Sequence, residues 1–139
     1  MPNFDSNGVE IRAFTISKKK IEKLLQNPRI IRNKLKVRST IHNAKLFIKV
    51  QKEFGSFYTY SMRFVGSKPK INKRKKMGDY LATTKESDSF SQDLKKRGFK
   101  FVGSTIIYAH MQACGMVNDH LTSCFRYREV NDLFSNVRL

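Results

Sequence analysis

Apolar residues recur at helical spacing through most of this chain, and this periodicity limits the fold more than any other feature. The longest such stretch is expected to run from Pro28 to about Glu53, with Pro28 in the first helical turn and Gly55 as a stop. Because we find no internal repeat and no strand-like alternation, the chain is predicted to be all-α. Further helices are expected after the caps Asp5 and Ser17, over 56–65, over Ser87–Arg97, after Gly103, and from about Asn118 onward.

The charge of the chain narrows the choice of partner. Its 139 residues, enough for one domain with a core, carry 28 Lys and Arg against 11 Asp and Glu, a net charge of +17. Such self-repulsion is easier to tolerate when the partner is a polyanion, either nucleic acid or an anionic membrane. No apolar run is long enough to span a bilayer, and the first ten residues do not resemble a signal peptide. Nucleic acid is therefore the predicted partner.

The cysteine content points to a compartment. Cys114 and Cys124 are the only two cysteines, and two do not make a disulfide framework. A reducing cytoplasm is therefore the expected location.

The densest group of basic residues lies between Lys68 and Lys76, around two glycines and a proline. We expect this segment to be a loop. Three interpretations stay open: a solvated connector, a nuclear-type address, or a contact with phosphate. The basic residues of the stretch from 28 to 53 lie mostly off its apolar face, which by itself indicates a solvated surface.

The segment Gly98–Gly103 joins two predicted helices through the sequence GFKFVG. A turn with a glycine at each end, followed by a helix N-terminus, directs backbone N–H groups at one point and suits a phosphate oxygen. Phe99, Phe101 and Val102 are expected to anchor the turn in the core. An ordinary helix–helix corner has the same glycines, so the spacing alone leaves both interpretations open.

His120 and Cys124 form a second pattern. If they lie on a helix, residues four apart share a face, and imidazole and thiolate are ligands that suit zinc. A structural zinc site needs four ligands, and Cys114, His42 and His110 do not have convincing spacing to complete it. A core cysteine near a surface histidine explains the pair as well.

The segment Leu94–Phe125, LKKRGFKFVGSTIIYAHMQACGMVNDHLTSCF, resembles the C-terminal signature of the DNA-3-methyladenine glycosylase I family. The similarity extends upstream to about Asn3, through NFD, a long stretch beginning ISKKKIEKLLQNPRIIRNK, KPKIN and ATTKESDSFSQDL, and ends near Tyr127. The resemblance implies an all-α, helix-hairpin-helix DNA glycosylase domain that is incomplete at its N-terminus. We expect this domain to occupy residues 1–130, followed by a tail over 131–139.

The resemblance also implies a function. Family members excise 3-methyladenine from alkylated double-stranded DNA by hydrolysis of the N-glycosidic bond, after flipping the base from the duplex. The hairpin that holds the DNA backbone would consist of Gly98, Phe99, Lys100, Phe101, Val102 and Gly103. His120 and Cys124 would be two of the four ligands of a structural zinc ion. We expect a monomer without a membrane partner.

Some features depart from the family pattern. A segment that precedes the matched region in the family supplies the other zinc ligands and the residues around the extruded base, so no catalytic residue is assigned here. The chain has no tryptophan, and Met62, Arg74 and His110 replace aromatic residues common in the family. Loss of large apolar residues weakens packing. We therefore expect this chain alone to have weak or no activity; the alternative is a non-enzymatic DNA-binding module.

Overall fold

The computed structural model describes residues 16–136 and divides the chain into two compact units. Among the described residues, the first unit comprises 16–60 and 94–102, and the second comprises 61–93 and 103–136. The helix expected after Asp5 lies outside the described residues.

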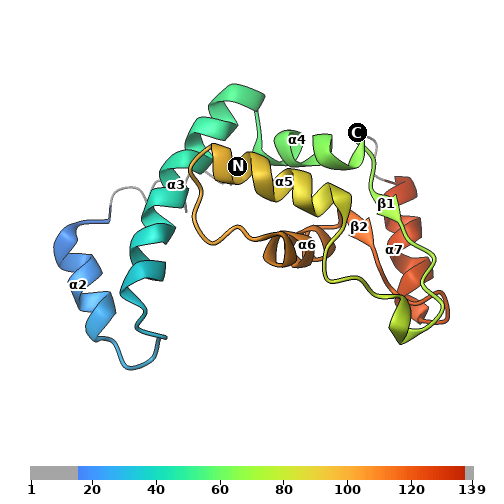
Figure 1. Cartoon of the computed structure of the whole chain (residues 1–139), viewed down its shortest axis with the longest axis horizontal. Coiled ribbons are helices and arrows are strands. Elements are labelled where there is room, and N and C mark those ends of the chain that lie inside the picture. The colour runs from blue at the N-terminus through green and yellow to red at the C-terminus, as the bar shows by residue number, and fades with distance from the viewer. Residues whose placement is uncertain (1–15, 137–139) are drawn as a thin grey trace. The chain divides into compact units, whose positions relative to one another are not determined.

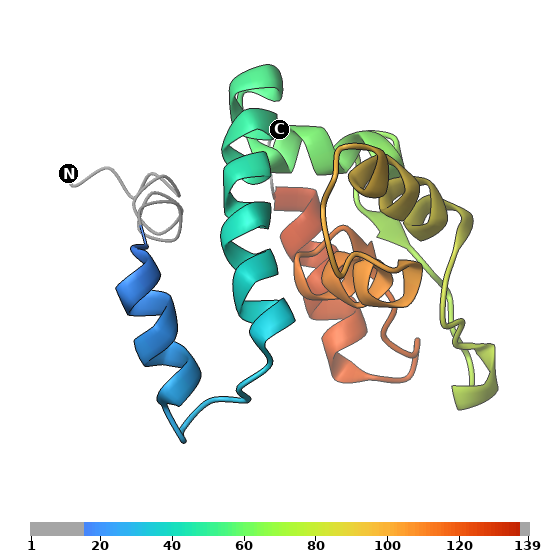
Figure 2. The ribbon, with the colours of Figure 1, turned by 60° about the vertical axis from the view of Figure 1, so that its left-hand side comes forward.

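The first unit is built on two helices, α2 (Lys18–Gln26) and α3 (Lys34–Phe54), which pack side by side and run in opposite directions (Figures 1 and 2). Ser17 caps α2 as predicted, because its hydroxyl accepts the backbone N–H of Lys20. The predicted start of α3 at Pro28 is wrong. Asn33 begins the helix instead, since its side chain accepts the N–H groups of the second and third helical residues at 3.0 and 3.1 Å.

The core of the first unit lies under α3. Val50, Tyr60, Leu94 and Phe99 are all buried. Aromatic rings of α3 and of the following helix α4 (Phe57–Met62) pack beside them, and the stacked pair has ring centroids 4.2 Å apart. Long-range apolar contacts of this kind hold the short segment 94–102 against α3, although it is distant from it in sequence.

The second unit contains the end of α4, the 3-10 helices η1 (Arg63–Val65) and η2 (Met77–Asp79), and most of α5 (Lys85–Lys96). It also contains α6 (Ser104–Ala113) and α7 (Phe125–Asn136). Strands β1 (Lys70–Ile71) and β2 (Val117–Asn118) pair in parallel, and an isolated bridge joins Arg74 to Leu121 (Figure 1). The sequence pattern did not predict this pairing, but two strands of two residues each leave the predicted all-α class confirmed.

Most of the predicted helices are present. The segment 56–65 forms α4 and η1, Ser87–Arg97 corresponds to α5, and α6 ends before Gly115, whose φ of 70° suits a helix stop. The core of the second unit contains Phe90, Met111 and Met116. Met62, for which the family resemblance implies an aromatic residue, is also buried, with 4% of its surface exposed. It therefore occupies a core position.

The last helix differs from the prediction. The expected start near Asn118 is wrong, because Val117 and Asn118 pair with β1 and α7 begins at Phe125. The residues assigned to a tail include Asn131, which accepts a hydrogen bond from the buried Asn118 side chain at 2.8 Å. Residues 131–136 are thus helical, while the domain boundary at residue 130 stays a prediction. Within 16–136, no helix is both long and apolar enough to cross a bilayer.

Candidate nucleic-acid interface

The turn that follows α5 has the geometry of a helix-terminating glycine motif. The N–H of Phe99 donates to the carbonyl of Leu94 at 3.0 Å, and the N–H of Gly98 donates to that of Lys95 at 2.9 Å. Gly98 has a φ of 92°, a conformation that residues with a side chain rarely adopt. These bonds satisfy the last carbonyls of the helix and fix the direction in which the chain leaves it.

Helix α3 holds this turn in place from within the first unit. The side-chain amide of Asn43 makes two hydrogen bonds with the backbone of Lys100, donating to its carbonyl at 2.8 Å and accepting from its N–H at 2.9 Å. His42 Nε2 lies 2.9 Å from the carbonyl oxygen of Gly98. Because a carbonyl oxygen only accepts, Nε2 carries the hydrogen. Asn43 and His42 together fix the turn at two points.

The aromatic residues of the turn have different roles. Phe99 is buried, with 7% of its surface exposed, and anchors the turn as predicted. Phe101 is 44% exposed and has a φ of 57°, so the prediction that it anchors the core is wrong. Its side chain leaves the core because this left-handed backbone conformation redirects its Cβ. Val102 is only partly buried.

Gly103, the second glycine of the predicted hairpin, begins the second unit and caps α6. Its φ of −62° is accessible to any residue, and a Cβ placed there would have no heavy atom within 4 Å. The described structure itself therefore does not require glycine at this position. The glycine instead leaves open space beside the backbone.

The basic residues near the turn also differ from one another. Arg97 donates to both carboxylate oxygens of Glu53, at 2.7 and 3.1 Å, and lies over the rings of Phe54 and Tyr60. Arg97 therefore has a structural role. Lys100 is exposed, and the ammonium of Lys36 lies 5.9 Å from the ring centroid of Phe101. Lys36 and Lys100, together with the exposed Lys96 just before Gly98, place positive charge near the turn in the first unit.

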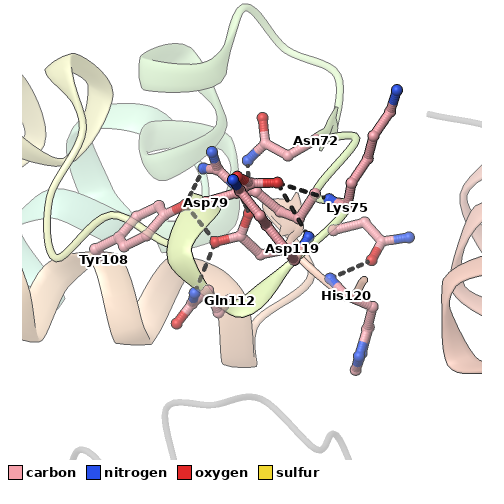
Figure 3. A network of polar contacts seen from close by, with 10 residues as sticks. Asn72, Lys75, Asp79, Tyr108, Gln112, Asp119 and His120 are labelled. Carbon is pink, nitrogen blue, oxygen red and sulfur yellow. Dashed lines mark hydrogen bonds and ion pairs between the residues drawn. The ribbon is translucent and has the colours of Figure 1, made fainter. Parts of the chain in front are cut away.

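The second unit contains a polar cluster around Asp119, which the sequence analysis did not predict (Figure 3). The side chain of Asp119 is only 5% exposed. Four side chains donate to its two oxygens: Asn72 at 3.0 Å, Arg74 at 2.8 Å, Tyr108 at 2.5 Å and Gln112 at 3.0 Å. A buried carboxylate is tolerated when it is paired and hydrogen-bonded to this extent.

The cluster shifts the protonation equilibria of its members. Burial raises the pKa of Asp119, but the four hydrogen bonds outweigh it and lower this pKa below its ordinary value. Burial, followed by the hydrogen bond to Asp119, raises the pKa of Tyr108 to about 12. The hydrogen bond to Asp119 raises the pKa of Arg74. At neutral pH the cluster therefore consists of an ionised carboxylate, a cation and a neutral phenol.

This arrangement changes the interpretation of Arg74. The family resemblance implies an aromatic residue at this position, and the structure shows that the Arg74 side chain is only 17% exposed and forms an ion pair with Asp119. The partly buried position is therefore stabilised by a charged hydrogen bond. The sequence signal that would have suggested this pairing is a cation in place of an apolar residue, which requires a buried anion elsewhere in the chain.

His120 and Cys124 do not lie on one helix, so this part of the prediction is wrong. Cys124 lies in a turn, where its N–H donates to the carbonyl of Leu121 at 2.9 Å, before α7 begins. Cys114 Sγ lies 3.5 Å from Nδ1 of His110, whose pKa is lowered by burial. In the part of the chain that the structure describes, no group of three or more His, Cys, Asp or Glu residues could hold a metal ion. His120 and Cys124 alone do not form a complete tetrahedral site.

A surface cleft of about 650 Å³ lies within the second unit, beside the Asp119 cluster. Gln112, His120 and Arg126 contribute polar groups to its wall, and Leu133 and Phe134 contribute apolar ones. An open cleft with mixed walls can accept a planar polar group or a protein segment. His120 and two members of the cluster, Gln112 and Asp119, line this cleft.

Comparison with known proteins identifies the class to which this fold belongs. The family model described as methyladenine glycosylase matches residues 2–127. The chain belongs to the methyladenine glycosylase family.

Individual relatives agree with this assignment. The chain is 36% identical over 117 residues to the DNA-3-methyladenine glycosylase 1 of Escherichia coli (strain K12). This match covers 84% of the chain and 63% of that protein. A crystal structure of 3-methyladenine DNA glycosylase I matches with 41% identity and a TM-score of 0.78, covering 84% of the chain and 64% of its own. A further crystal structure, of a variant in complex with 3-methyladenine, matches at 25% identity with a TM-score of 0.79, covering 84% and 62%. The chain therefore spans slightly less than two thirds of these relatives.

Proposed function

We propose that this chain provides the DNA-holding part of an enzyme that removes 3-methyladenine from alkylated double-stranded DNA. In this proposal, the helix-hairpin-helix turn Gly98–Gly103 contacts the phosphate backbone. The relatives are named 3-methyladenine glycosylases, which supports the reaction class. The observation that carries the proposal is the turn fixed by Asn43 and His42, which orders the backbone of a loop before any ligand arrives.

The proposal assigns cleavage to residues in the part of the relatives that this chain does not span. A phosphate-holding turn binds substrate and transition state equally, and uniform binding does not accelerate the chemical step. Stabilisation of the departing base needs groups placed around it. We therefore expect the 139-residue chain to bind DNA and to release 3-methyladenine at no more than the spontaneous rate.

The test measures both properties of the purified chain. DNA binding is followed by fluorescence anisotropy, and release of 3-methyladenine is followed from alkylated duplex DNA. Fusion in frame to the remaining part of a full-length relative is expected to restore excision. Robust excision by the unfused chain would show that the cleavage residues lie within 1–139. Absence of DNA binding by a folded chain would refute the DNA-holding role.

A non-enzymatic DNA-binding module is the second candidate function. It is favoured by the net charge of +17, because a basic chain can hold a polyanion without a pocket for an extruded base. The same fusion distinguishes the two candidates. A folded fusion that binds DNA but does not excise would favour the module.

We further propose that His120 and Cys124 supply two ligands of a structural zinc ion. Their side chains are an imidazole and a thiol, which suit zinc, and two ligands leave half of the tetrahedron to water. We expect the isolated chain to bind zinc weakly and below one equivalent. Metal analysis after dialysis checks this, and one tightly held equivalent would mean that other residues, with Cys114 as the first candidate, complete the site.

The protein is also proposed to act as a monomer in the bacterial cytoplasm. Both described cysteines are free thiols, as expected in a reducing compartment, and the curated relatives are bacterial. Light scattering coupled to size-exclusion chromatography tests the oligomeric state.

A further inference from the structure

We infer that the lysine-rich segment Lys73–Lys76 is a second phosphate-binding element, kept in an extended conformation by Asp119. This inference rests on the proposed binding of DNA, and it concerns a surface of the second unit that the turn of the first unit does not include. The chemistry of the partner is a polyphosphate backbone.

The backbone around this segment is held by a row of hydrogen bonds. The N–H groups of Lys70 and Asn72 donate to the carbonyls of Met116 and Asn118 at 2.9 and 3.0 Å. The carbonyl of Arg74 accepts the N–H of Thr122 at 2.8 Å. The segment therefore continues the pairing begun by β1 and β2, and it is ordered to a greater extent than a solvated connector needs.

Side chains alternate along this extended segment. Asn72 and Arg74 point inward and donate to Asp119, as described above. In an extended chain the intervening residues point the opposite way, and Lys73 and Lys75 are both exposed. Figure 3 shows the side chain of Lys75 directed away from Asp119. Residues two apart on an extended chain are separated by about 7 Å. Lys73 and Lys75 therefore extend from the same edge of the segment at this spacing.

The end of the segment is fixed as well. The carboxylate of Asp79 accepts the backbone N–H groups of Lys75 and Lys76 at 2.9 and 3.1 Å, which lowers the pKa of Asp79. These bonds engage the backbone and leave the side chain of exposed Lys76 pointing into solvent. Three lysine side chains thus project from a backbone that is already ordered, which reduces the conformational entropy lost on binding a polyanion.

Lysines act as point charges that displace counterions from phosphates, so the inference predicts a measurable salt dependence. We would compare the full chain with its K73Q/K75Q/K76Q variant, titrating a labelled DNA duplex at several salt concentrations. Each lost phosphate contact lowers the slope of log K against log salt by about 0.9, so a decrease of about 2 to 3 is expected. Affinity at low salt should fall about tenfold or more.

The matched control is K18Q/K19Q/K20Q, which removes three exposed lysines from α2 and lowers the net charge equally. If attraction were a matter of net charge alone, both variants would lose the same affinity and the inference would be overturned. An unchanged slope in the K73Q/K75Q/K76Q variant would also overturn it. If wild-type binding were itself independent of salt, the proposed DNA binding would fail first.

Asp119→Asn tests whether the Asp119 cluster orders the lysine segment, because net charge and this ordering predict opposite changes in DNA affinity. This variant becomes more positive by one charge, so an unspecific electrostatic model expects equal or tighter DNA binding. The inference expects binding at least about threefold weaker in protein whose thermal unfolding shows it to be folded. Asn72→Ala, which removes one hydrogen bond to Asp119 without a charge change, replaces it if Asp119→Asn does not fold. Tighter binding by the folded Asp119→Asn variant, or wild-type affinity in folded Asn72→Ala, would overturn the scaffold role.

An anionic membrane surface is the other polyanion that the lysine segment could bind, and it must be distinguished from DNA. Vesicles of phosphatidylglycerol and phosphatidylcholine are titrated with the same proteins. A K73Q/K75Q/K76Q variant that loses vesicle binding but keeps wild-type DNA binding would assign the segment to a membrane surface and overturn the inference.

Discussion

The two units of this chain use charge in opposite ways. Among the described residues, the first unit has 16 Lys and Arg against two Asp and Glu, whereas the second has ten against seven. In the first unit the turn is held by uncharged groups, the amide of Asn43 and the imidazole of His42. In the second unit a buried ion pair, Arg74 with Asp119, organises the surrounding loop.

The difference shows how a strongly basic chain can order its phosphate-binding elements. In the first unit, one ion pair, Arg97 with Glu53, lies beside the turn, but further ion pairs would reduce the excess charge that attracts DNA. Neutral hydrogen bonds avoid this loss. In the second unit, the buried carboxylate of Asp119 is neutralised by the inward-pointing Arg74. The outward-pointing lysines of the segment Lys73–Lys76 therefore stay available to bind phosphate.

Removal of Asp119 is expected to have the largest effect on stability. Asp119→Ala leaves the mostly buried Arg74 without its anion, which should cost about 3 kcal/mol of unfolding free energy. The matched variant is Glu53→Ala in the first unit, whose carboxylate is 52% exposed; solvent screening limits its cost to about 1 kcal/mol or less. Chemical denaturation of both variants measures the difference, and equal costs would contradict the contrast between the units.

Asn43 should have the next largest effect. Asn43→Ala removes both side-chain hydrogen bonds to the backbone of Lys100, with an expected loss of about 1 to 2 kcal/mol and weaker DNA binding. Thr40→Ala is the control on the same helix, because the Thr40 hydroxyl bonds within α3, to the carbonyl of Lys36. DNA anisotropy and thermal melting are measured for both. Wild-type DNA affinity in the Asn43→Ala variant would show that the turn needs no support from α3.

The two glycines of the predicted hairpin should respond differently to substitution. Gly98→Ala places a side chain at a φ of 92° and should cost about 1 to 2 kcal/mol of stability. Gly103→Val meets open space in the described structure, so it should weaken DNA binding with little change in stability. Comparison of melting temperatures with DNA affinities for the two variants tests this. Unchanged DNA affinity in folded Gly103→Val would show that Gly103 belongs to an ordinary helix–helix corner that does not contact DNA.

The sequence predicted local structure better than long-range pairing. The Ser17 cap, α5 and α6 depend on nearby residues, and these predictions are confirmed. The start of α3 was misplaced because Pro28 and Asn33 are both acceptable near a helix start, and only the backbone conformation selects Asn33. The pairing of β1 with β2 joins segments too short to give a periodic pattern.

The candidate site shows the same division. The turn after α5 was predicted from its glycines, but nothing local marks Asn43 as its partner, since the amide acts on a residue far along the chain. Asp119 gave no signal because two of its donors, Asn72 and Arg74, lie 47 and 45 residues away in the chain, and the nearby donors of α6 show no pattern that marks a buried carboxylate. His120 and Cys124 were assigned to a helix on spacing alone, and the strand pairing of Asn118 displaced the start of α7.

The smallest expected effect is the response of the second unit to acid. Hydrogen bonds lower the pKa of Asp119 in the folded state below the value of 3.8 for the free group, so the folded state favours the ionised form. A carboxyl with a depressed folded pKa stabilises the fold fully above the unfolded pKa, and this stabilisation is lost as the pH falls through the folded pKa. We therefore expect the melting temperature to be steady near neutral pH and to fall below about pH 4. Asp119→Asn lacks the titrating group and should show a shallower fall. Identical acid profiles for wild type and Asp119→Asn would mean that the cluster does not contribute to the pH dependence of stability.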